Sequence, residues 1–270
     1  MEKKVKKDLV IITGVTGAIG SALLEQYGQR KNTVIVGITR KSQTWKNFIN
    51  KKTGKIYCGT LLCAVEFEEK EVKNFIAHID VEEFARVTFI HCVGDYQFEV
   101  DSVGNFTTEN DKDGDGINDL VKFLSYDLFK WFAGNLMRKT KSQLDFVIFG
   151  SLADKYEPKS FKSWWQTMKK TEHFMSSVMT KKIGFFRFDI SSVFCPHELI
   201  TRPFVFTHTD ADQTSWLSPS KLASEVIRAL DTSNGGFHKN DMFEHWDGFS
   251  SDYYQDEKIV PRRLLEIGQL

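Results

Sequence analysis

Cysteine is scarce in this sequence, and its pattern excludes two kinds of stabilised scaffold. The chain has 270 residues and 4 cysteines, which are Cys58, Cys63, Cys92 and Cys195. They are too sparse for a disulfide framework, and Cys58 and Cys63 stand without the second pair that a zinc site requires. We therefore expect reduced thiols, a cytoplasmic location and no metal site.

An excess of charge of one sign and long apolar runs are also lacking. Lys plus Arg and Asp plus Glu both number 36, so the formal net charge is zero. Binding to nucleic acid through its phosphates needs a surplus of cations, so we expect no nucleic-acid partner. Glycines at positions 14, 17 and 20 interrupt the apolar stretch after the basic N-terminus. No segment approaches the roughly 18 apolar residues of a membrane span, so we expect neither a signal peptide nor a membrane partner.

Apolar and aromatic residues, by contrast, are plentiful enough for a large core. Hydrophobic residues make up 41% of the chain, with 23 Phe and 6 Trp. Only 5 prolines are present and no Pro-rich linker divides the sequence, so we predict a single domain over residues 1–270.

Short apolar runs rich in β-branched residues alternate along the chain with longer stretches of helical periodicity. This order predicts an α/β fold, a Rossmann-like doubly wound parallel sheet of about seven strands in three αβα layers. The predicted strands are Leu9–Thr13, Thr33–Thr39, Lys55–Cys58, Arg86–Val93, Asp145–Phe149, Ile183–Asp189 and Met242–His245. The predicted helices are Ala18–Arg30, Ser42–Asn50, Glu68–Ile79, Ile117–Lys139, Ser160–Thr180 and Ser220–Leu230.

A glycine-rich turn follows the first predicted strand and opens the first helix, in the pattern TGxxGxxG from Thr13 to Gly20. Glycines at these places permit a tight turn, close approach of the backbone to a diphosphate, and tight packing of helix on sheet. The helix N-terminus also directs N–H groups and a positive dipole end at the phosphates. The alternative is a purely structural turn. We predict a dinucleotide site formed by Gly14, Thr16, Gly17, Ala18, Ile19 and Gly20.

The residues at the end of the second strand indicate which dinucleotide the chain binds. Proteins of this fold that bind NAD place a carboxylate there for the ribose hydroxyls, whereas an Arg accommodates the 2′-phosphate of NADP. The segment Thr39–Ser42 holds Arg40 and Lys41 and no carboxylate, which favours NADP(H) over NAD(H). The alternative is an ordinary solvated basic loop.

These motifs, in this order, resemble the short-chain dehydrogenase/reductase family over almost the whole chain. The segment His91–Gly94 stands where the family has an Asn-Asn-Ala-Gly segment that lines the cofactor, and Trp246-Asp-Gly248 is placed like its last strand. The resemblance implies that Cys92, Val93 and Gly94 contact the cofactor. It also implies that the segment of about 191–219 covers a small-molecule substrate.

The resemblance implies a catalytic serine and a lysine, and the main departure from the family pattern lies beside that lysine. Ser151, at the end of the fifth strand, matches the serine that hydrogen-bonds the substrate carbonyl or hydroxyl. The best match to the family's Tyr-x-x-x-Lys is Trp165–Lys169, in which Lys169 keeps the role of holding the nicotinamide ribose. An indole N–H cannot give up its proton at working pH, so Trp165 does not replace the tyrosine as an acid. The family's helper asparagine falls near Ser125.

Another group must then supply the proton. Tyr156 lies five residues beyond Ser151, on what we expect to be an active-site loop, and its phenol is one candidate. A loop tyrosine with a packing role only is the alternative, and bound substrate or water is a third source.

An acidic segment, Asp111–Asp119, carries the Asp-x-Asp-x-Asp-Gly start of a calcium loop. Its twelfth position is Lys122, where an EF-hand needs a bidentate glutamate. We therefore favour a solvated loop that caps the following helix, with calcium binding as the alternative.

Aromatic residues exceed what a sheet-facing stripe needs in the two helices over 117–139 and 160–180. In the family the corresponding helices pair with their copies across a two-fold axis, which implies a homodimer or homotetramer.

Three functions follow from these observations. The first is an NADP(H)-dependent reductase or dehydrogenase acting on a small carbonyl, alcohol or sugar-like substrate with a degenerate active site. The second is a non-catalytic NADP(H)-binding sensor or scaffold, which the missing tyrosine and asparagine favour. The third is a pocket recruited for a non-redox reaction.

Overall fold

The computed structural model describes residues 6–39, 60–65, 67–94, 99, 101, 103, 105–108, 110–190, 193, 217–233 and 235–242. Within them a parallel sheet of seven strands runs in the order β3-β2-β1-β4-β5-β6-β7. The strands are β1 (Asp8–Thr13), β2 (Thr33–Thr39), β3 (Thr60–Ala64), β4 (Arg86–His91), β5 (Gln143–Ser151), β6 (Ile183–Ile190) and β7 (Gly236–Met242). The predicted α/β class, the parallel sheet and the number of strands are confirmed.

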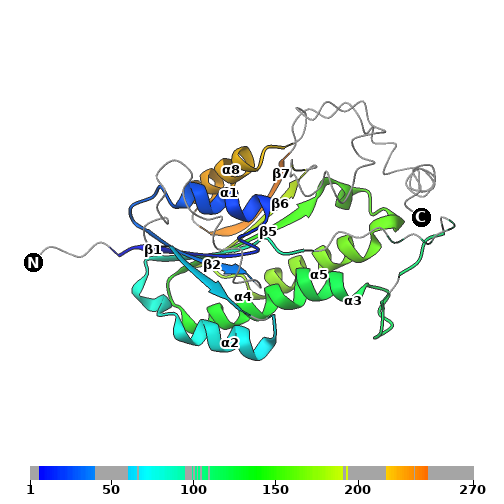
Figure 1. Ribbon diagram of the computed structural model, residues 1–270, viewed down its shortest axis with the longest axis horizontal. Coiled ribbons are helices and arrows are strands. Elements are labelled where there is room, and N and C mark those ends of the chain that lie inside the picture. Colours follow the sequence, from blue (N-terminus) through cyan, green and yellow to red (C-terminus); the bar gives the residue numbers. More distant parts are fainter. Residues whose placement is uncertain are drawn as a thin grey trace, which may run out of the picture.

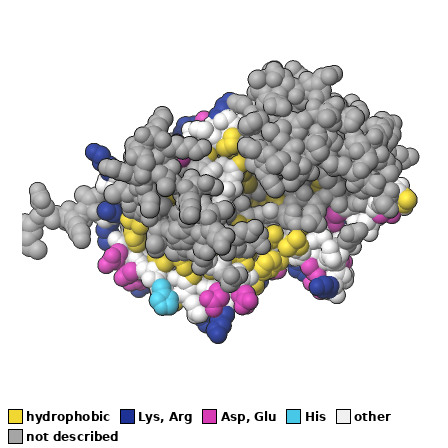
Figure 2. Space-filling model, in the orientation of Figure 1, with side chains coloured by type: hydrophobic (Ala, Val, Ile, Leu, Met, Phe, Trp, Pro, Cys, Tyr) yellow, Lys and Arg dark blue, Asp and Glu magenta, His cyan; other side chains and the backbone are white. Residues whose placement is uncertain are grey.

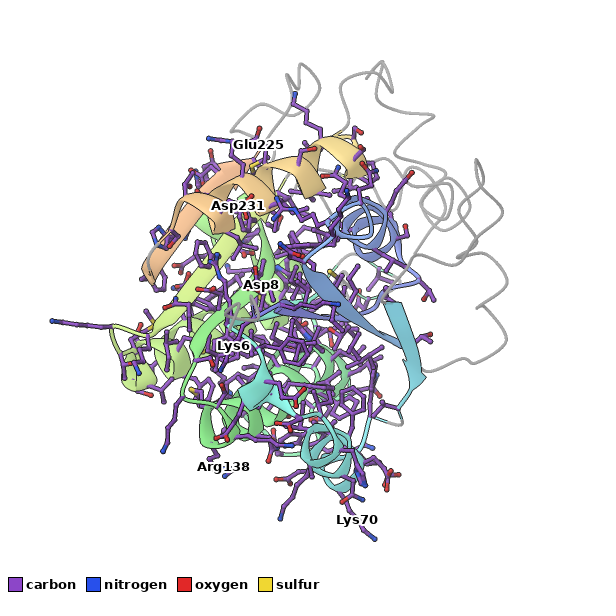
Figure 3. All side chains as sticks on the ribbon, turned by 90° about the vertical axis from the view of Figure 1, so that its left-hand side faces the viewer. Lys6, Asp8, Lys70, Arg138, Glu225 and Asp231 are labelled. Atoms are coloured by element: carbon purple, nitrogen blue, oxygen red, sulfur yellow. The ribbon has the colours of Figure 1, made fainter. Side chains whose placement is uncertain are left out.

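Helices cover both faces of the sheet, as Figure 1 shows. Helices α1 and α8 lie on one face, and α2, α3, α4 and α5 lie on the other (Figure 1). Their bounds are α1 (Ala18–Tyr27), α2 (Glu69–His78), α3 (Asp119–Lys122), α4 (Leu128–Lys139), α5 (Lys162–Val178) and α8 (Pro219–Thr232). In Figure 3, Glu225 and Asp231 of α8 lie on one side of the sheet, and Lys70 and Arg138 lie on the other. This arrangement gives the expected three layers.

The sheet has a separate apolar core on each face. Inner strands are buried along nearly their whole length because helices cover both of their sides. Under α2, α4 and α5 the core combines aliphatic side chains with a group of phenylalanines, and the rings of Phe89 and Phe132 stack with centroids 5.0 Å apart. Under α1 and α8 the core is mainly aliphatic, with Ile12, Leu23 and Val226 fully buried. These two cores fix the positions of the carboxyl ends of the strands, where the candidate functional site lies.

Two predicted strands differ from the structure by more than two residues at an end. The last strand, predicted at Met242–His245, ends at Met242 and begins at Gly236. It is an edge strand whose side chains alternate between half-buried and exposed, so it lacks the apolar run that marks the inner strands. The third strand is Thr60–Ala64, whereas the predicted range Lys55–Cys58 lies outside the described residues. The predicted helix Ser42–Asn50 also lies outside them.

The long helix predicted over 117–139 is interrupted by a wider turn. Between α3 and α4 the backbone forms one π-helical turn, η3 (Phe123–Asp127). The apolar spacing continues through this turn, which is why the sequence pattern does not reveal it. Single π-helical turns within α-helices occur often at functional sites, and this one contains Ser125.

The described surface shows charges of both signs intermixed. On the face drawn in Figure 2, Lys and Arg side chains lie among Asp and Glu side chains along the edge that α2 occupies in Figure 1. This mixture agrees with the zero net charge of the sequence. Among the described residues, no helix is both long and apolar enough to cross a membrane.

Candidate functional site

The turn between β1 and α1 depends on three glycines. Gly14 has a φ of +64°, and a Cβ there would lie 2.6 Å from the carbonyl oxygen of Cys92. A Cβ on Gly20 would lie 2.3 Å from the carbonyl oxygen of Gly14. Gly17 is the N-cap of α1, and its N–H donates to the Gly14 carbonyl over 2.9 Å. A side chain at position 14 or 20 would therefore displace the backbone that shapes this turn.

The first turn of α1 is suited to hold an anion. Its cap has no side-chain hydrogen bond, and no acidic residue stands in its first turn. The first N–H groups of a helix have no partner within the helix, so those of Ala18 and Ile19 can donate to a ligand. Beside the turn, the N–H of Cys92 donates to the carbonyl of Thr13 over 3.2 Å, which joins the ends of β1 and β4. The residues present fit the diphosphate of a dinucleotide.

The position of this turn in the sheet agrees with a ligand crevice. Strand β1 pairs with β2 on one side and with β4 on the other, so the chain reverses its direction of winding there. Open α/β sheets bind ligands at the carboxyl ends of the strands at such a switch point. Gly14 and Gly94 both follow strands at that point. Arg40, the residue predicted to select NADP(H), lies outside the described residues.

A second part of the site lies between β4, η3 and α5. A Cβ on Gly94 would lie 3.0 Å from the ring of Trp164 and 3.4 Å from Oγ of Ser125. The Ser125 side chain is buried, and its Oγ has no hydrogen-bond partner within the described residues. The structure thus brings together Gly94, Ser125 and Trp164. Sequence reasoning singled out Trp165 instead, although Trp164 and Met168 share the apolar stripe of α5.

The N-terminus of α5 is fixed by a buried carboxylate. Glu99 is 6% exposed and accepts hydrogen bonds from N and Oγ of Ser163, the first of them over 2.6 Å. The Ser163 Oγ in turn accepts from the N–H of Asn118 over 2.7 Å. This network ties the start of α5 to the start of α3, and so holds Trp164 in its place.

The predicted catalytic residues lie on β5, on α5 and on the connection between them. Ser151 is half-buried at the carboxyl end of β5, and its N–H donates to Oδ2 of Asp154 over 3.1 Å. The ammonium of Lys169 lies 4.7 Å from the centre of the Trp165 ring and pairs with Glu157. This contact confirms that Trp165 and Lys169 share one helix face.

That helix face contacts the connection after Ser151. Trp165 donates from Nε1 to the carbonyl of Pro158 over 3.2 Å, so its indole donor is engaged. The Lys169 side chain is 54% exposed. Tyr156 lies on the same connection and is 40% exposed. Tyr156 thus belongs to the loop at 156–158, and Trp165 and Lys169 contact that loop. The catalytic roles of Tyr156 and Lys169 stay predictions.

A charge cluster with a buried centre lies beside Ser151, and no local pattern in the sequence indicates it. Arg187 of β6 is 3% exposed and pairs with Asp154, Asp189 and Glu172. Lys239 of β7 lies 3.2 Å from Asp189. The partners come from four separate parts of the chain, so only the folded structure brings them together.

Two carboxylates of the acidic segment at 111–119 are paired with lysines. Asp111, Asp113 and Asp115 have carboxylate oxygens within 4.8 Å of one another, and Lys122 pairs with the last two. Burial opposes the charge of Asp115, but Lys122 and Lys170 lower its pKa to about 2.

The same loop caps α3, as we predicted, through an amide side chain. Oδ1 of Asn118 accepts from the N–H groups of Leu120 and Val121 over 2.9 and 3.2 Å.

Comparison with known proteins gives fold similarity alone. No protein-family model matches the sequence, and no curated protein matches it. Among solved structures, L-sorbose reductase from Gluconobacter frateurii, complexed with NADPH and L-sorbose, has a TM-score of 0.66 and 14% identity, covering 90% of this chain and 97% of its own. Alcohol dehydrogenase from Thermococcus sibiricus, complexed with 5-hydroxy-NADP, has a TM-score of 0.65 and 10% identity, covering 90% and 99%. A putative short-chain dehydrogenase from Pseudomonas syringae has a TM-score of 0.66 and 12% identity, covering 87% and 95%. This chain is similar to them throughout the fold.

Proposed function

We propose that this chain is an NADP(H)-binding oxidoreductase of the short-chain dehydrogenase/reductase family. The observation that carries the proposal is the turn from Gly14 to Gly20, where a positive φ, two close backbone approaches and an uncapped helix N-terminus occur together. This combination suits a diphosphate. The fold neighbours named above include one complexed with NADPH and one complexed with an NADP derivative, which supports the choice of cofactor.

The reaction we propose is reduction of a small carbonyl, or the reverse oxidation of an alcohol or sugar-like substrate. When bound, the cofactor supplies or accepts the hydride. Ser151 stands at the carboxyl end of β5, where its hydroxyl can donate to a substrate oxygen. Ser125, whose buried Oγ has no partner among the described residues, is a second donor beside Gly94.

In this proposal the protein does not use a tyrosine on α5 as its acid. Trp164 and Trp165 occupy the helix positions nearest to the family's tyrosine, and an indole keeps its proton at working pH. Tyr156, substrate or water remains the source of the proton, as the sequence suggests. The site that we propose is therefore degenerate compared with the family pattern.

The second candidate function is a non-catalytic NADP(H)-binding protein. Two observations favour it. The ring of Trp164 packs against Gly94, at the point where the family pattern places the cofactor, and Lys169 pairs with Glu157. In this case the bound dinucleotide acts as a signal or as a structural element, and no turnover occurs.

A binding titration followed by a turnover assay separates the two candidates. We expect pure protein to bind NADPH more tightly than NADH in calorimetry, and Arg40→Ala to weaken NADPH binding only. If neither dinucleotide binds, the proposed function is wrong. Binding together with NADPH consumption on a panel of carbonyls, lost in Ser151→Ala, supports the oxidoreductase. Binding without consumption supports the second candidate.

A further inference from the structure

The cluster around Arg187 joins five charged side chains, of which Glu172 and Lys239 lie at its more exposed edge with 25% and 41% of their side chains exposed. Nη2 of Arg187 lies 2.5 Å from Oδ2 of Asp154, Nε lies 2.5 Å from Oδ1 of Asp189, and Nη1 lies 2.8 Å from Oε1 of Glu172. Lys239 adds an ammonium 3.2 Å from Oδ2 of Asp189. The side chains of Arg187, Asp154 and Asp189 are 3%, 6% and 0% exposed. Water therefore does little to screen them.

This network is attached to the backbone of the predicted catalytic serine. Oδ2 of Asp154 accepts from the N–H of Ser151 over 3.1 Å while it also contacts Arg187. One residue earlier, a Cβ on Gly150 would lie 2.2 Å from Oδ1 of Asp189 and 2.8 Å from Nε of Arg187. The end of β5 is thus held through the amide of Ser151 and by close packing at Gly150.

The charges of the network do not balance. Arg187 and Lys239 carry two positive charges, and Asp154, Asp189 and Glu172 carry three negative charges when all are ionised. An unbalanced charge that is shielded from water is costly, so such a cluster tends to take up a proton.

Asp154 is the carboxyl group in the network that takes up this proton. Burial raises its pKa to about 7, although Arg187, the N–H of Ser151 and Lys239 act in the opposite direction, and Asp189 adds to the rise. Burial also works against the charge of Arg187, but its three carboxylate partners outweigh that cost and raise its pKa. The guanidinium therefore stays charged while Asp154 titrates.

Every described element packed around Asp154 contributes to its surroundings. Strand β6 supplies Arg187 and Asp189, α5 supplies Glu172, and β7 supplies Lys239. The neighbouring Lys155 is engaged with Asp241 of β7 over 2.5 Å and forms a separate, more exposed pair.

We propose that Asp154 is a positioning residue for Ser151. Its ionised carboxylate, anchored by Arg187, fixes the amide of Ser151 and with it the direction of the serine hydroxyl, and proton uptake by Asp154 loosens that hold. The role of Asp154 in catalysis rests on the proposed function, because only in that function does Ser151 bind a substrate. The hydrogen bonds and the titration do not rest on it.

The first test reads the amide of Ser151 directly. In deuterated, 15N-labelled protein, we expect the Ser151 amide resonance to titrate with a single midpoint near pH 7, with or without NADPH. In Asp154→Asn that titration should vanish, and in the control Asp241→Asn it should persist. An amide that does not shift between pH 5 and 9 in the wild type, or that titrates unchanged in Asp154→Asn, overturns the proposal.

A second variant keeps the test decisive if Asp154→Asn does not fold. Glu172→Gln removes one negative charge from the network without touching Asp154 or Ser151. Because two cations then face two carboxylates, we expect the midpoint of the Ser151 amide to fall by at least half a pH unit. An unchanged midpoint would show that the network does not govern this titration.

Measurement of turnover tests the role of Asp154 in catalysis. For a carbonyl substrate of the wild-type protein, we expect kcat in Asp154→Asn to fall about tenfold or more and to lose its dependence on pH near 7, while the Kd for NADPH stays unchanged. Absence of NADPH binding in the wild type would overturn the proposed function and leave the amide titration intact. An unchanged kcat and pH profile in an otherwise active Asp154→Asn would overturn the positioning role alone.

Discussion

His91 donates a hydrogen bond from Nε2 to the carbonyl oxygen of Leu124 over 2.8 Å. A carbonyl can only accept, so Nε2 carries the proton, and Nδ1 accepts from Oγ1 of Thr13 over 2.9 Å. One buried imidazole therefore ties the last residue of β1, just before the dinucleotide turn, to the π-helical turn that contains Ser125. This residue couples the two halves of the candidate site.

Acid should weaken the protein through His91. Burial lowers its pKa to about 4, although the bond to Leu124 opposes the change. Between pH 6.5 and 4 the unfolded chain binds a proton that the folded protein does not, so the stability that neutral His91 contributes is lost as the pH falls. We expect a loss of up to about 3 kcal/mol in the free energy of unfolding over this range.

Urea denaturation of the wild type and of His91→Phe at pH 8 and at pH 5 would measure this loss. At pH 8 the variant should be less stable by about 1–3 kcal/mol, because Thr13 and Leu124 lose their partner. At pH 5 the gap should narrow. Replacement of the exposed His78 by Gln is the control, with no comparable change. A gap that stays constant with pH would contradict the prediction.

Gly14→Ala should abolish dinucleotide binding and destabilise the fold. The backbone has a φ of +64° there, and the new Cβ would lie 2.6 Å from the Cys92 carbonyl. We expect a loss of about 1–3 kcal/mol in the free energy of unfolding, together with loss of the NADPH calorimetric signal.

Gly134→Ala is the matched control for this change. A Cβ at Gly134, in the middle of α4, meets nothing within 4 Å. Since alanine favours a helix interior, this variant should be more stable by about 0.5–1 kcal/mol and should bind NADPH normally. Normal binding by Gly14→Ala would remove the turn from the proposed site.

Stability should also report the titration of Asp154. Its pKa is raised in the folded protein to about 7 from an ordinary value of 3.8. The folded state then binds the extra proton, so its stabilising effect is complete below about pH 4 and is lost as the pH rises through 7. Relative to Asp154→Asn, the wild type should lose a few kcal/mol of unfolding free energy between pH 4 and 7. A difference that is constant or that rises over this range would contradict the assignment.

Lys122→Glu should convert the acidic loop into a calcium site. The ammonium of Lys122 pairs with Asp113 and Asp115, at the place where a calcium loop has its bidentate glutamate. With glutamate there, calcium at about 100 times its Kd should stabilise the variant by about 2.7 kcal/mol. Thermal melts with calcium and with EDTA would measure the effect, and Lys122→Gln should respond less. Equal responses in the two variants would show that the glutamate is not a ligand.

The sequence predicts the sheet well because its inner strands are continuous apolar runs between helices. It misplaces β7, since the edge strand from Gly236 to Met242 has polar residues such as Lys239 and Asp241 along its length. The glycine turn is readable from the sequence because steric needs restrict it to glycine, whereas the π-helical turn at Ser125 keeps a helical pattern.

The least predictable part of the site is its charge network. Arg187 and Asp154 are 33 residues apart, and nothing in their local sequence indicates that both side chains are buried. Trp164 and Trp165 are adjacent aromatic residues on one helix, and only the packing of α5 on the sheet decides which of the two indoles faces Gly94.

The order of the strands affects how this chain folds during its synthesis. Every neighbouring pair in the sheet is parallel, so each pairing must await a crossover, and β1 meets β4 only after 78 further residues. During synthesis the first strand and its glycine turn emerge long before one of their two neighbours exists. We expect slow acquisition of the native state and a need for protection of that apolar strand on the ribosome.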